Sequence, residues 1–375
     1  MIYLDNAATT YPKPESVYKA LDFANRNLSF NAGRGAYPKA KECLTVLDDL
    51  RKEIASFIKA DYKDVSLLSS ATEALNLIIY GLSLTKTSTV YVSPFEHNAI
   101  IRPLHNLQKK IGFKILVLPF NKKTWKPEVN KINDLFALNN PSVVFVSQVS
   151  NVTGLIVEYE PVFRIAKKFN SVNVLDSSQS YGIVPLNKND VDYIVFAGHK
   201  SLYGPFGIAG FINLSSTELD IIKSGGNGSD TLNPEMPDKH HERYEAGSPN
   251  LPAAYGLLES IKWLKTVDVY HHEKCLTNYA LEKLKTLDKI NIFIPDNAES
   301  IFGIISIGID GYSADEIGQI LADEFEIMIR TGYHCSPLVH EFINSTKNGG
   351  TARISISYFN SKDDIDCLID ALASF

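Results

Sequence analysis

Short runs of apolar and β-branched residues alternate with helical patterns between about residue 65 and residue 213. Strands buried on both faces of a sheet have this continuous apolar character, and strands separated by helices pair in parallel. The pattern therefore predicts an α/β fold with a mostly parallel sheet and helices on both faces. The expected strands are 65–68, 89–93, 114–118, 143–147, 172–176, 193–197 and 208–213, with helices at 72–82, 98–111 and 162–169.

The second half of the chain has a different pattern. Residues 224–250 are rich in Gly, Pro, Asn and charge, which predicts a long loop or hairpin, and a loop of that length is usually functional. We expect a large domain over 16–255 and a smaller α/β domain made of 1–15 and 256–375. The elements expected there are a long helical region at 252–287, strands at 303–309 and 352–358, and helices at 314–324 and 362–373.

Length, charge and cysteine content argue against a nucleic-acid-binding, membrane-spanning or secreted protein. A chain of 375 residues is long for a single core, which agrees with two domains. The net charge of −6 and the absence of a basic stripe argue against a nucleic-acid partner. The apolar stretch 75–84 is too short to span a membrane. Residues 1–5 lack the pattern of a secretory signal and the four cysteines are scattered, so we expect a reducing, cytoplasmic location.

Two residues at strand ends suggest a cofactor site. Lys200 follows the apolar strand 193–197, at the edge where open α/β sheets bind ligands, although a lysine in a loop is more often only solvated. Asp176 ends the strand 172–176. A buried carboxylate is costly without a cationic partner, and the pyridinium nitrogen of pyridoxal 5′-phosphate (PLP) is such a partner.

Two further segments agree with this interpretation. Residues 69–73 join a strand to a helix, and hydroxyl and N–H groups at a helix N-terminus bind phosphate. The alternative for this segment is a simple helix cap on Thr72. His97 follows strand 89–93, where an imidazole can stack on a cofactor ring and exchange protons, although a lone histidine is more often structural.

In order along the chain, these motifs resemble the fold-type I PLP enzymes, and more closely the class V aminotransferase superfamily. The resemblance covers essentially the whole chain, and the ordered set is specific although each motif alone is weak. The segments that carry it are 3–10 (YLDNAATT), 96–98 (EHN), 149–154 (VSNVTG), 176–179 (DSSQ), 198–200 (GHK) and 243–250 (RYEAGSPN).

The resemblance implies a role for each residue that matches a motif. Lys200 would form the Schiff base with PLP, Asp176 would pair with the pyridine nitrogen and His97 would stack on the ring. The family is dimeric with its sites at the interface, so Ser248 would reach the phosphate of the partner subunit. The remaining implied cofactor contacts are Asn151 and Gln179 at the phenolic oxygen, and Ala71, Thr72 and His199 at the phosphate.

One position departs from the family pattern. Relatives usually have a hydroxyl residue that binds phosphate where this chain has Ala197. Ser201 is an extra hydroxyl nearby, and whether it compensates is left open by the sequence.

A second motif, at 328–337, resembles the Arg-Thr-Gly-His-His-Cys segment of group II cysteine desulfurases, with Tyr333 in place of the first histidine. Desulfuration needs a protein thiolate, and an ordinary thiol is mostly protonated at neutral pH. Arg330 and His334 would supply positive charge or a proton acceptor beside Cys335. The alternative is a buried, inert cysteine, which is also our expectation for Cys43, Cys275 and Cys367.

The expected reaction converts L-cysteine to L-alanine and leaves the sulfur on Cys335 as a persulfide. Arginine binds carboxylates in a planar, bidentate way, so Arg353 fits the family's clamp for the substrate carboxylate. Arg330, Asn151 and Arg34 are further candidates for substrate binding. The short stretch between Cys335 and Arg353 resembles that of enzymes which use an acceptor protein, and the loop 225–242 is a candidate docking surface.

Other functions remain open at the level of sequence. Selenocysteine cleavage, another C–S lyase reaction or a transamination needs the same cofactor site, and Tyr333 and Ala197 leave these possible. A scaffold without activity is a further alternative, against which Lys200, Asp176 and His97 argue together. A metal site at His334, Cys335 and His340 does not match zinc spacing, so we expect no metal.

Overall fold

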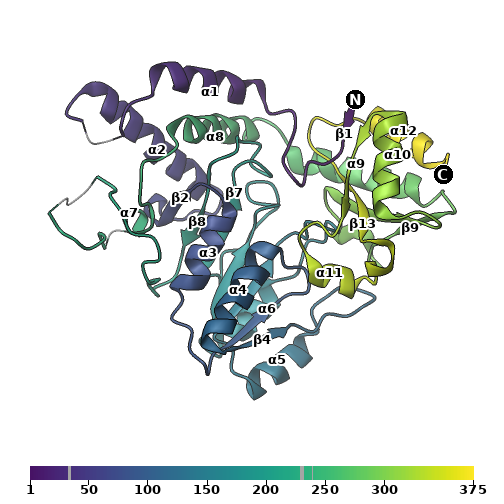
Figure 1. The fold of residues 1–375 in the computed structure, drawn as a ribbon, viewed down its shortest axis with the longest axis horizontal. Coiled ribbons are helices and arrows are strands. Elements are labelled where there is room, and N and C mark those ends of the chain that lie inside the picture. Colours follow the sequence, from purple (N-terminus) through teal and green to yellow (C-terminus); the bar gives the residue numbers. More distant parts are fainter. Residues whose placement is uncertain (33–34, 229–231, 239) are drawn as a thin grey trace.

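A computed structural model describes residues 1–32, 35–228, 232–238 and 240–375 (Figure 1). Its main feature is a seven-stranded sheet in the order β2-β8-β7-β6-β5-β3-β4. The strands run parallel except β8, which is antiparallel to both of its neighbours, so the expected mostly parallel sheet is confirmed. The strands are β2 (Val65–Leu68), β3 (Thr89–Val92), β4 (Lys114–Val117), β5 (Val143–Ser147), β6 (Val172–Asp176), β7 (Tyr193–Ala197) and β8 (Ala209–Asn213).

Alternate residues of these strands pack against helices on opposite faces of the sheet, because side chains alternate along a strand. In β5, Val143 and Phe145 pack with the helices α3 and α4, whereas Val144 and Val146 belong to a second cluster on the other face. That second cluster includes α2, α6 and α8. The helices of this unit are α1 (Glu15–Asn27), α2 (Pro38–Ser56), α3 (Ala71–Gly81), α4 (Asn98–Ile111), α5 (Val129–Leu138), α6 (Glu160–Lys167) and α8 (Leu251–Leu264).

The C-terminal part forms a smaller antiparallel sheet in the order β12-β13-β10-β9, with helices packed beside it (Figure 1). The helical region expected over 252–287 consists of two helices, because α8 ends at Leu264. A new helix begins at Val269, where the Asp268 carboxylate accepts a hydrogen bond from the His271 N–H at 3.0 Å. The elements are β9 (Ile290–Ile292), β10 (Ile304–Ile309), β12 (Arg330–Gly332), β13 (Thr351–Ser355), α9 (Val269–Leu284), α10 (Ala314–Phe325), α11 (Pro337–Phe342) and α12 (Lys362–Leu372).

The N-terminal segment packs with the C-terminal unit, as expected. Strand β1 (Ile2–Tyr3) pairs in parallel with β11 (Ile327–Met328), and Asp5 forms a bridge to Ser355. The segment then turns to the large sheet, where the Thr10 N–H donates to the His199 carbonyl at 3.2 Å. It therefore connects the two sheets next to Lys200.

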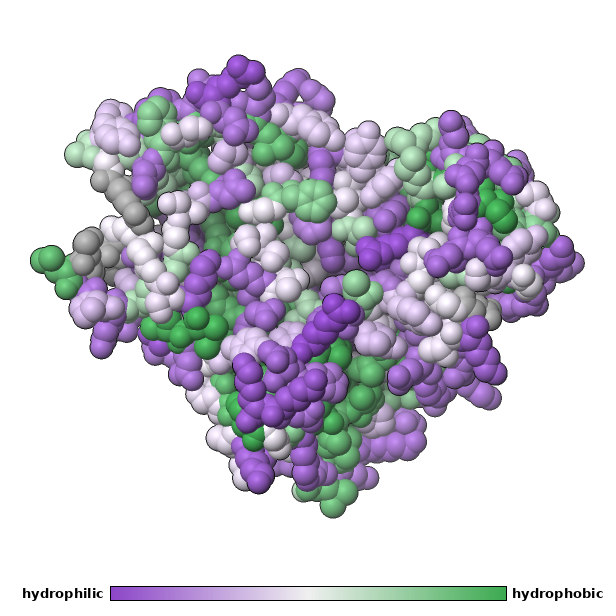
Figure 2. All heavy atoms as spheres, in the orientation of Figure 1, coloured by the Kyte–Doolittle hydropathy of each residue, from purple (hydrophilic) through white to green (hydrophobic). Residues whose placement is uncertain are grey.

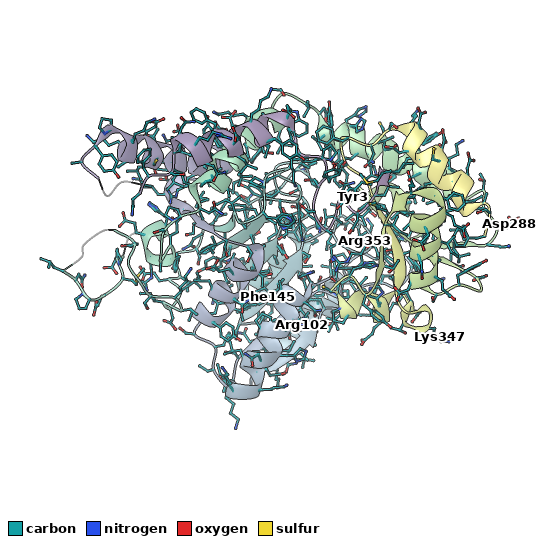
Figure 3. All side chains as sticks on the ribbon, turned by 45° about the horizontal axis from the view of Figure 1, so that its top comes forward. Tyr3, Arg102, Phe145, Asp288, Lys347 and Arg353 are labelled. Carbon is teal, nitrogen blue, oxygen red and sulfur yellow. The ribbon has the colours of Figure 1, made fainter. Side chains whose placement is uncertain are left out.

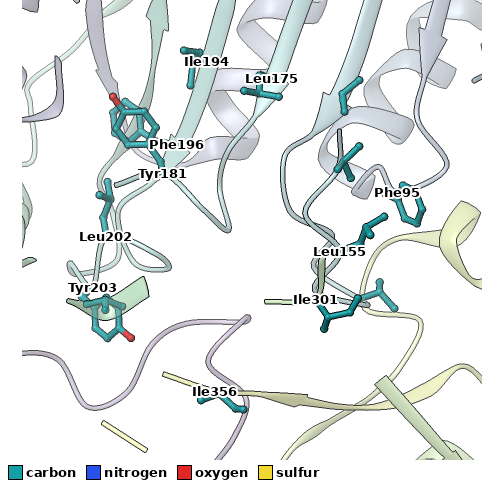
Figure 4. Close-up of a cluster of buried hydrophobic side chains, with 14 of the residues drawn as sticks. Phe95, Leu155, Leu175, Tyr181, Ile194, Phe196, Leu202, Tyr203, Ile301 and Ile356 are labelled. Carbon is teal, nitrogen blue, oxygen red and sulfur yellow. The ribbon is translucent and has the colours of Figure 1, made fainter. Parts of the chain in front are cut away.

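One continuous apolar cluster extends from the large sheet to the C-terminal unit. Figure 4 shows Leu175 and Ile194 on the large sheet, and Ile301 and Ile356 at the other end of the same cluster. The proposed domain boundary at 255–256 falls within α8 and stays a prediction.

The surface carries mixed polarity, with hydrophilic residues spread over the face in Figure 2 and hydrophobic residues in smaller groups between them. No helix in the described ranges is long and apolar enough to cross a membrane. The segment 224–250 is mostly irregular where it is described, apart from the short helix α7 (His240–Tyr244).

Candidate active site

The candidate site lies at the carboxyl ends of the parallel strands β5, β6 and β7. Asp176 is the last residue of β6 and pairs in register with Ser147 at the end of β5, while Lys200 follows the end of β7. This is the edge at which open α/β sheets bind ligands. One pocket there is lined by most of the expected cofactor contacts, namely Ala71, Thr72, His97, Asn151, Asp176, Gln179, His199 and Lys200.

The amino group of Lys200 has an environment that favours its uncharged form. Burial lowers the pKa of Lys200 below its usual range, and the carboxylate of Asp176 opposes this effect only in part. Arg353 and Arg330 lower the pKa further. A lysine that loses its proton more easily is a better nucleophile toward a carbonyl carbon.

Asp176 is held by a single neighbouring residue. Its Oδ1 accepts hydrogen bonds from the Ser178 N–H at 2.9 Å and the Ser178 hydroxyl at 2.5 Å. Both bonds end on the same oxygen, so the lone pairs of Oδ2 are left for a ligand in the pocket. Burial of this carboxylate, with 7% of its surface exposed, fits a cationic ring nitrogen as the missing partner.

His97 is the N-cap residue of α4, and its Nδ1 accepts a hydrogen bond from the Ala99 N–H at 3.0 Å. Burial, together with the positive charges of Lys200 and Arg330, lowers the pKa of His97 to about 3. The ring is therefore neutral at pH 7. Because Nδ1 accepts, the proton of this neutral ring resides on Nε2.

Glu96 is a buried carboxyl group to which the sequence assigned no role. It accepts hydrogen bonds from the Ser93 hydroxyl at 2.5 Å and from both the N–H and the hydroxyl of Ser147 at 2.8 Å. Burial raises the pKa of Glu96 to about 7. These bonds fix the turn before α4 to the end of β5, and so set the position of His97 over the pocket.

The turn between β2 and α3 leaves donors available for an anion. Ser70, not Thr72, caps α3, because its hydroxyl accepts from the Glu73 N–H at 3.1 Å, so the alternative of a Thr72 cap is wrong. The described residues offer no hydrogen-bond partner to the N–H groups of Ala71 and Thr72. Free N–H groups at a helix N-terminus are an anion-binding arrangement.

His199 supplies another unpartnered donor or acceptor. Its ring stacks on Phe206 with centroids 4.5 Å apart, and its buried Nδ1 has no hydrogen-bond partner among the described residues. Ser201 does not replace the hydroxyl missing at Ala197, because its Oγ donates to the Tyr181 carbonyl at 2.9 Å and Ser201 lies outside the lining of this pocket.

Two amide side chains connect the pocket to its surroundings. The Gln179 Nε2 donates to the Ala7 carbonyl at 2.9 Å. The Asn151 Nδ2 donates to the His334 carbonyl at 2.8 Å, while its Oδ1 accepts from the Ser336 hydroxyl at 2.7 Å. Asn151 therefore holds both residues that flank Cys335 beside the pocket.

Cys335 lies in a tight turn that packs on the start of α4. Its carbonyl accepts from the Asn98 N–H at 2.6 Å, and both His334 and Cys335 have positive φ values, of 45° and 58°. The Nη2 of Arg330 lies 3.9 Å from the Cys335 Sγ. This guanidinium places a positive charge beside the sulfur.

His334 does not supply positive charge to this cysteine. Its Nε2 lies 3.0 Å from the Thr351 carbonyl oxygen and 2.9 Å from the Thr351 hydroxyl. Burial first, and then the charge of Arg353, lowers the pKa of His334 to about 2, so the ring is neutral at pH 7. Of the two residues expected to provide the charge, Arg330 is the one that does.

Arg353 is buried between the N-terminal segment and the pocket. It donates from Nη2 to the Asp5 carboxylate at 2.5 Å and from Nη1 to the Asn151 carbonyl at 2.9 Å. Figure 3 shows Arg353 beside Tyr3, inward from the outer positions of Asp288 and Lys347. Its buried Nε has no partner among the described residues, which leaves the Nε–H for a substrate carboxylate.

Some expected residues are not part of this assembly. Ser248 is exposed and lines a different cavity, together with Lys223 and Glu245. Arg34 lies outside the described residues.

The other cysteines differ from expectation in part. Cys43 is buried as expected, whereas Cys275 and Cys367 are exposed, so their expected burial is wrong. Both lie on the solvent side of helices that pack through other faces.

Comparison with known proteins assigns the family. Residues 2–368 match the family model described as Aminotransferase class-V. The chain belongs to the class V aminotransferase family. A "Probable cysteine desulfurase" of Pyrococcus abyssi is 28% identical and covers 99% of this chain and 93% of the relative. A "Cysteine desulfurase" of Wigglesworthia glossinidia brevipalpis is 30% identical, covering 99% and 92%.

A solved structure has the same fold as this chain. The apo structure of a cysteine desulfurase from Thermococcus onnurineus NA1 superposes with a TM-score of 0.90 at 26% identity, covering 100% of this chain and 94% of that one. The expected fold class and family resemblance are thus confirmed.

Proposed function

We propose that this class V protein is a PLP-dependent cysteine desulfurase that converts L-cysteine to L-alanine and keeps the sulfur on Cys335 as a persulfide. The observation that carries the proposal is the position of Cys335. Its backbone bonds to the first turn of α4 beside His97, and its thiol lies 3.9 Å from Arg330. A thiol with a neighbouring cation is thus placed next to the pocket that contains Lys200. The names of the relatives agree with this activity.

The pocket residues fit PLP by their chemistry. Lys200 would bind the cofactor covalently, Asp176 Oδ2 would pair with the ring nitrogen and His97 would stack on the ring. The free N–H groups of Ala71 and Thr72 and the unpartnered Nδ1 of His199 support the binding of its phosphate. When bound, the cofactor would supply an electron sink for bonds at the substrate α-carbon.

The residues of the chain supply the remaining steps. Arg353 would bind the substrate carboxylate through its free Nε, with Arg330 near the sulfur. Lys200, once its amino group is free, would move the α-proton. The Cys335 thiolate would then attack the substrate sulfur. An S–S bond forms, the C–S bond breaks with its electron pair on the substrate carbon, and protonation of that carbon yields alanine.

We further propose that the active form is a cytoplasmic homodimer that delivers sulfur to an acceptor protein. Ser248 is exposed and outside the Lys200 pocket, which agrees with a role in the site of a partner subunit. Described cysteines are all free thiols, which suits a reducing compartment.

The test is the visible absorbance of the purified protein with and without L-cysteine, with alanine and persulfide measured in the same sample. A cofactor band that responds to cysteine, together with alanine and Cys335 persulfide, supports the proposal, and Lys200→Ala should lose the covalent band. A responsive band without alanine would instead indicate another class V reaction. Absence of a band after PLP is added would contradict any PLP-dependent function.

A further inference from the structure

A polar groove extends from Cys335 along α3 and α4, away from the cofactor pocket. Its volume is about 400 Å³, and its walls are the faces of two packed helices. Residues four positions apart share a helix face. The groove is lined by Thr72, Asn76 and Tyr80 on α3, by Asn98, Arg102 and Asn106 on α4, and by Cys335 with His97, Ala99 and Pro103.

The ends of the groove are defined by hydrogen bonds. At one end the Cys335 carbonyl accepts from the Asn98 N–H at 2.6 Å, which fixes the cysteine to the first turn of α4. At the other end the Asn106 side chain donates to the Tyr80 hydroxyl at 2.6 Å and joins the two helices. Hydrogen bonds therefore fix both ends of the groove, and Cys335 lies at one of them.

Arg102 is the one residue with a formal charge among those that line the groove. It is exposed, and the described part of the chain offers it neither a carboxylate within ion-pair distance nor a hydrogen-bond acceptor. Figure 3 shows it on the α4 side of the molecule. One helical turn separates Asn98 from Arg102, a rise of roughly 6 Å. An unpaired guanidinium thus lines the same groove as Cys335, one helical turn from the residue that bonds the cysteine carbonyl.

We propose that this groove is a subsite for sulfur acceptors that carry a carboxylate close to the attacking thiol. The inference rests on the proposed desulfurase function and specifies the chemistry of its acceptor. The acceptor carboxylate pairs with Arg102, and its thiolate is aligned with Cys335. Arginine is suited to this task because its planar fork binds both carboxylate oxygens.

The transfer step at this subsite needs no other reactant. The acceptor thiolate attacks the outer sulfur of the Cys335 persulfide, and a new S–S bond forms on the acceptor. The bond between the outer sulfur and the Cys335 Sγ breaks, and Sγ leaves with the electron pair as a thiolate beside Arg330. The sulfane sulfur is transferred from Cys335 to the acceptor thiol without net oxidation or reduction.

The experiment follows loss of persulfide from preloaded protein, so the rate of loading does not enter. The background carries Cys275→Ser and Cys367→Ser, because both of those thiols are exposed. The probes are 3-mercaptopropionate, neutral 2-mercaptoethanol, and two short peptides with Glu or Lys next to a cysteine. Arg102→Glu is compared with Lys109→Glu, a charge reversal at an exposed position of the same helix outside the groove. For each probe, the rate of persulfide loss in a variant is divided by the rate in the background protein, so the intrinsic reactivity of the probe thiol cancels.

We expect Arg102→Glu to slow transfer to the Glu peptide about tenfold, as for loss of one charge-assisted contact. Transfer to 2-mercaptoethanol should change less than about twofold, and Lys109→Glu should have no selective effect. A matching loss with 3-mercaptopropionate identifies free thiol acids as sufficient acceptors, whereas a loss with the peptide alone identifies a polypeptide. Equal effects of Arg102→Glu on all four probes, or none, would overturn the subsite.

Failure of the desulfurase function gives a different result. If L-cysteine does not load Cys335, the persulfide is installed with inorganic polysulfide and the same comparison is made. A selective loss of transfer to the carboxylate probes in Arg102→Glu then supports the subsite even though the proposed function fails. An increased KM for L-cysteine in Arg102→Glu, with unchanged probe selectivity, would assign Arg102 to the substrate and overturn the inference.

Discussion

At the residue scale, the four cysteines differ in what surrounds the sulfur. Cys43 is buried, and Cys275 and Cys367 are exposed on helices. Only Cys335, among the described thiols, has a guanidinium nitrogen near its Sγ, at 3.9 Å. The thiolate is the nucleophilic form of cysteine, and Arg330 places a positive charge beside this one sulfur.

This contrast predicts separate effects for two cysteine variants. Cys335→Ser should lower alanine formation from L-cysteine by about 100-fold or more, because the covalent sulfur acceptor is lost. It should leave the cofactor spectrum unchanged, and it should retain cleavage of L-selenocysteine, which depends less on the thiol. The control Cys275→Ser should behave as the unchanged protein. Full cysteine activity in Cys335→Ser would remove this residue from the mechanism.

Sequence alone predicted the residues that follow strand ends but not those defined by distant partners. Asp176 ends an apolar strand, whereas Lys200 and His97 follow one, and parallel strands bring such positions together. Glu96 bonds Ser147 across 51 positions, and Asp5 bonds Arg353 across 348. Such pairs are set by tertiary packing, so no local pattern reveals them.

At the element scale, the close contact between the end of β12 and the residue before β13 determines where the Cys335 segment lies. Gly350 has φ +102°, and a Cβ there would come within 2.2 Å of the Gly332 carbonyl oxygen. A side chain at this position would force β12, with Arg330, away from β13, with Arg353. Gly311 has a similar φ of +91° but has open space around it.

The two glycines form a matched pair of variants. Gly350→Ala should lower the free energy of unfolding by about 3 kcal/mol or more, through backbone strain and a steric clash. It should also reduce persulfide formation. Gly311→Ala should cost about 1 kcal/mol, from strain alone. Urea unfolding measures both, and equal losses would show that the contact with Gly332 is unimportant.

The attachment of the N-terminal segment gives a second prediction at this scale. Asp5→Asn removes the charge partner of buried Arg353 and should destabilise the protein by about 2 kcal/mol or more. It should also raise the KM for L-cysteine, because Arg353 loses its orientation. Glu326→Gln breaks an exposed pair with the N-terminal amine and should cost less than about 1 kcal/mol. Similar urea midpoints for the two variants would contradict this role of Asp5.

Strands were easier to predict than helix ends. The strands at 65–68, 143–147, 172–176 and 193–197 match the structure because fully buried strands are continuous apolar runs. The break between α8 and α9 was missed, since a cap at Asp268 is a single polar residue within an otherwise helical pattern. Helices α1, α2 and α5 were not predicted, because partly exposed amphipathic helices give a weaker pattern.

At the scale of the whole molecule, two sheets enclose several histidines that folding keeps neutral. Burial lowers the pKa of His334 to about 2 and those of His97 and His199 to about 3. These folded-state values lie below the unfolded value of about 6.5. Between the folded and the unfolded pKa values, the unfolded chain binds more protons than the folded protein. The free energy of unfolding is therefore highest above about pH 6.5 and decreases as the pH falls.

The molecule should therefore lose stability in mild acid, and one buried histidine should account for a measurable share. Between pH 7 and pH 5 the free energy of unfolding should decrease by about 2 kcal/mol less in His334→Asn than in the unchanged protein, because His334 is 4% exposed in the folded state. His105→Asn, at an exposed position of α4, is the control. Urea unfolding at several pH values measures the effect. Parallel pH profiles for His334→Asn and the unchanged protein would contradict the burial argument.

The fold class followed from the order of strands and helices, but the relation between the two sheets did not. The sequence indicated that the N-terminal segment packs with the C-terminal unit, and strand β1 does so. It did not indicate that Thr10 and Lys13 also bond the His199 carbonyl beside the candidate site. Contacts between units depend on surface complementarity, which has no periodic pattern.

The most direct test of the central claim is the mass of the Cys335 peptide after one turnover with L-cysteine. The protein loaded with PLP is mixed with one equivalent of cysteine, alkylated under nonreducing conditions and digested. We expect a gain of one sulfur atom on the peptide that contains Cys335, in a yield that matches the alanine released. Alanine released without sulfur on that peptide, or with sulfur on Cys275 or Cys367 instead, would contradict it.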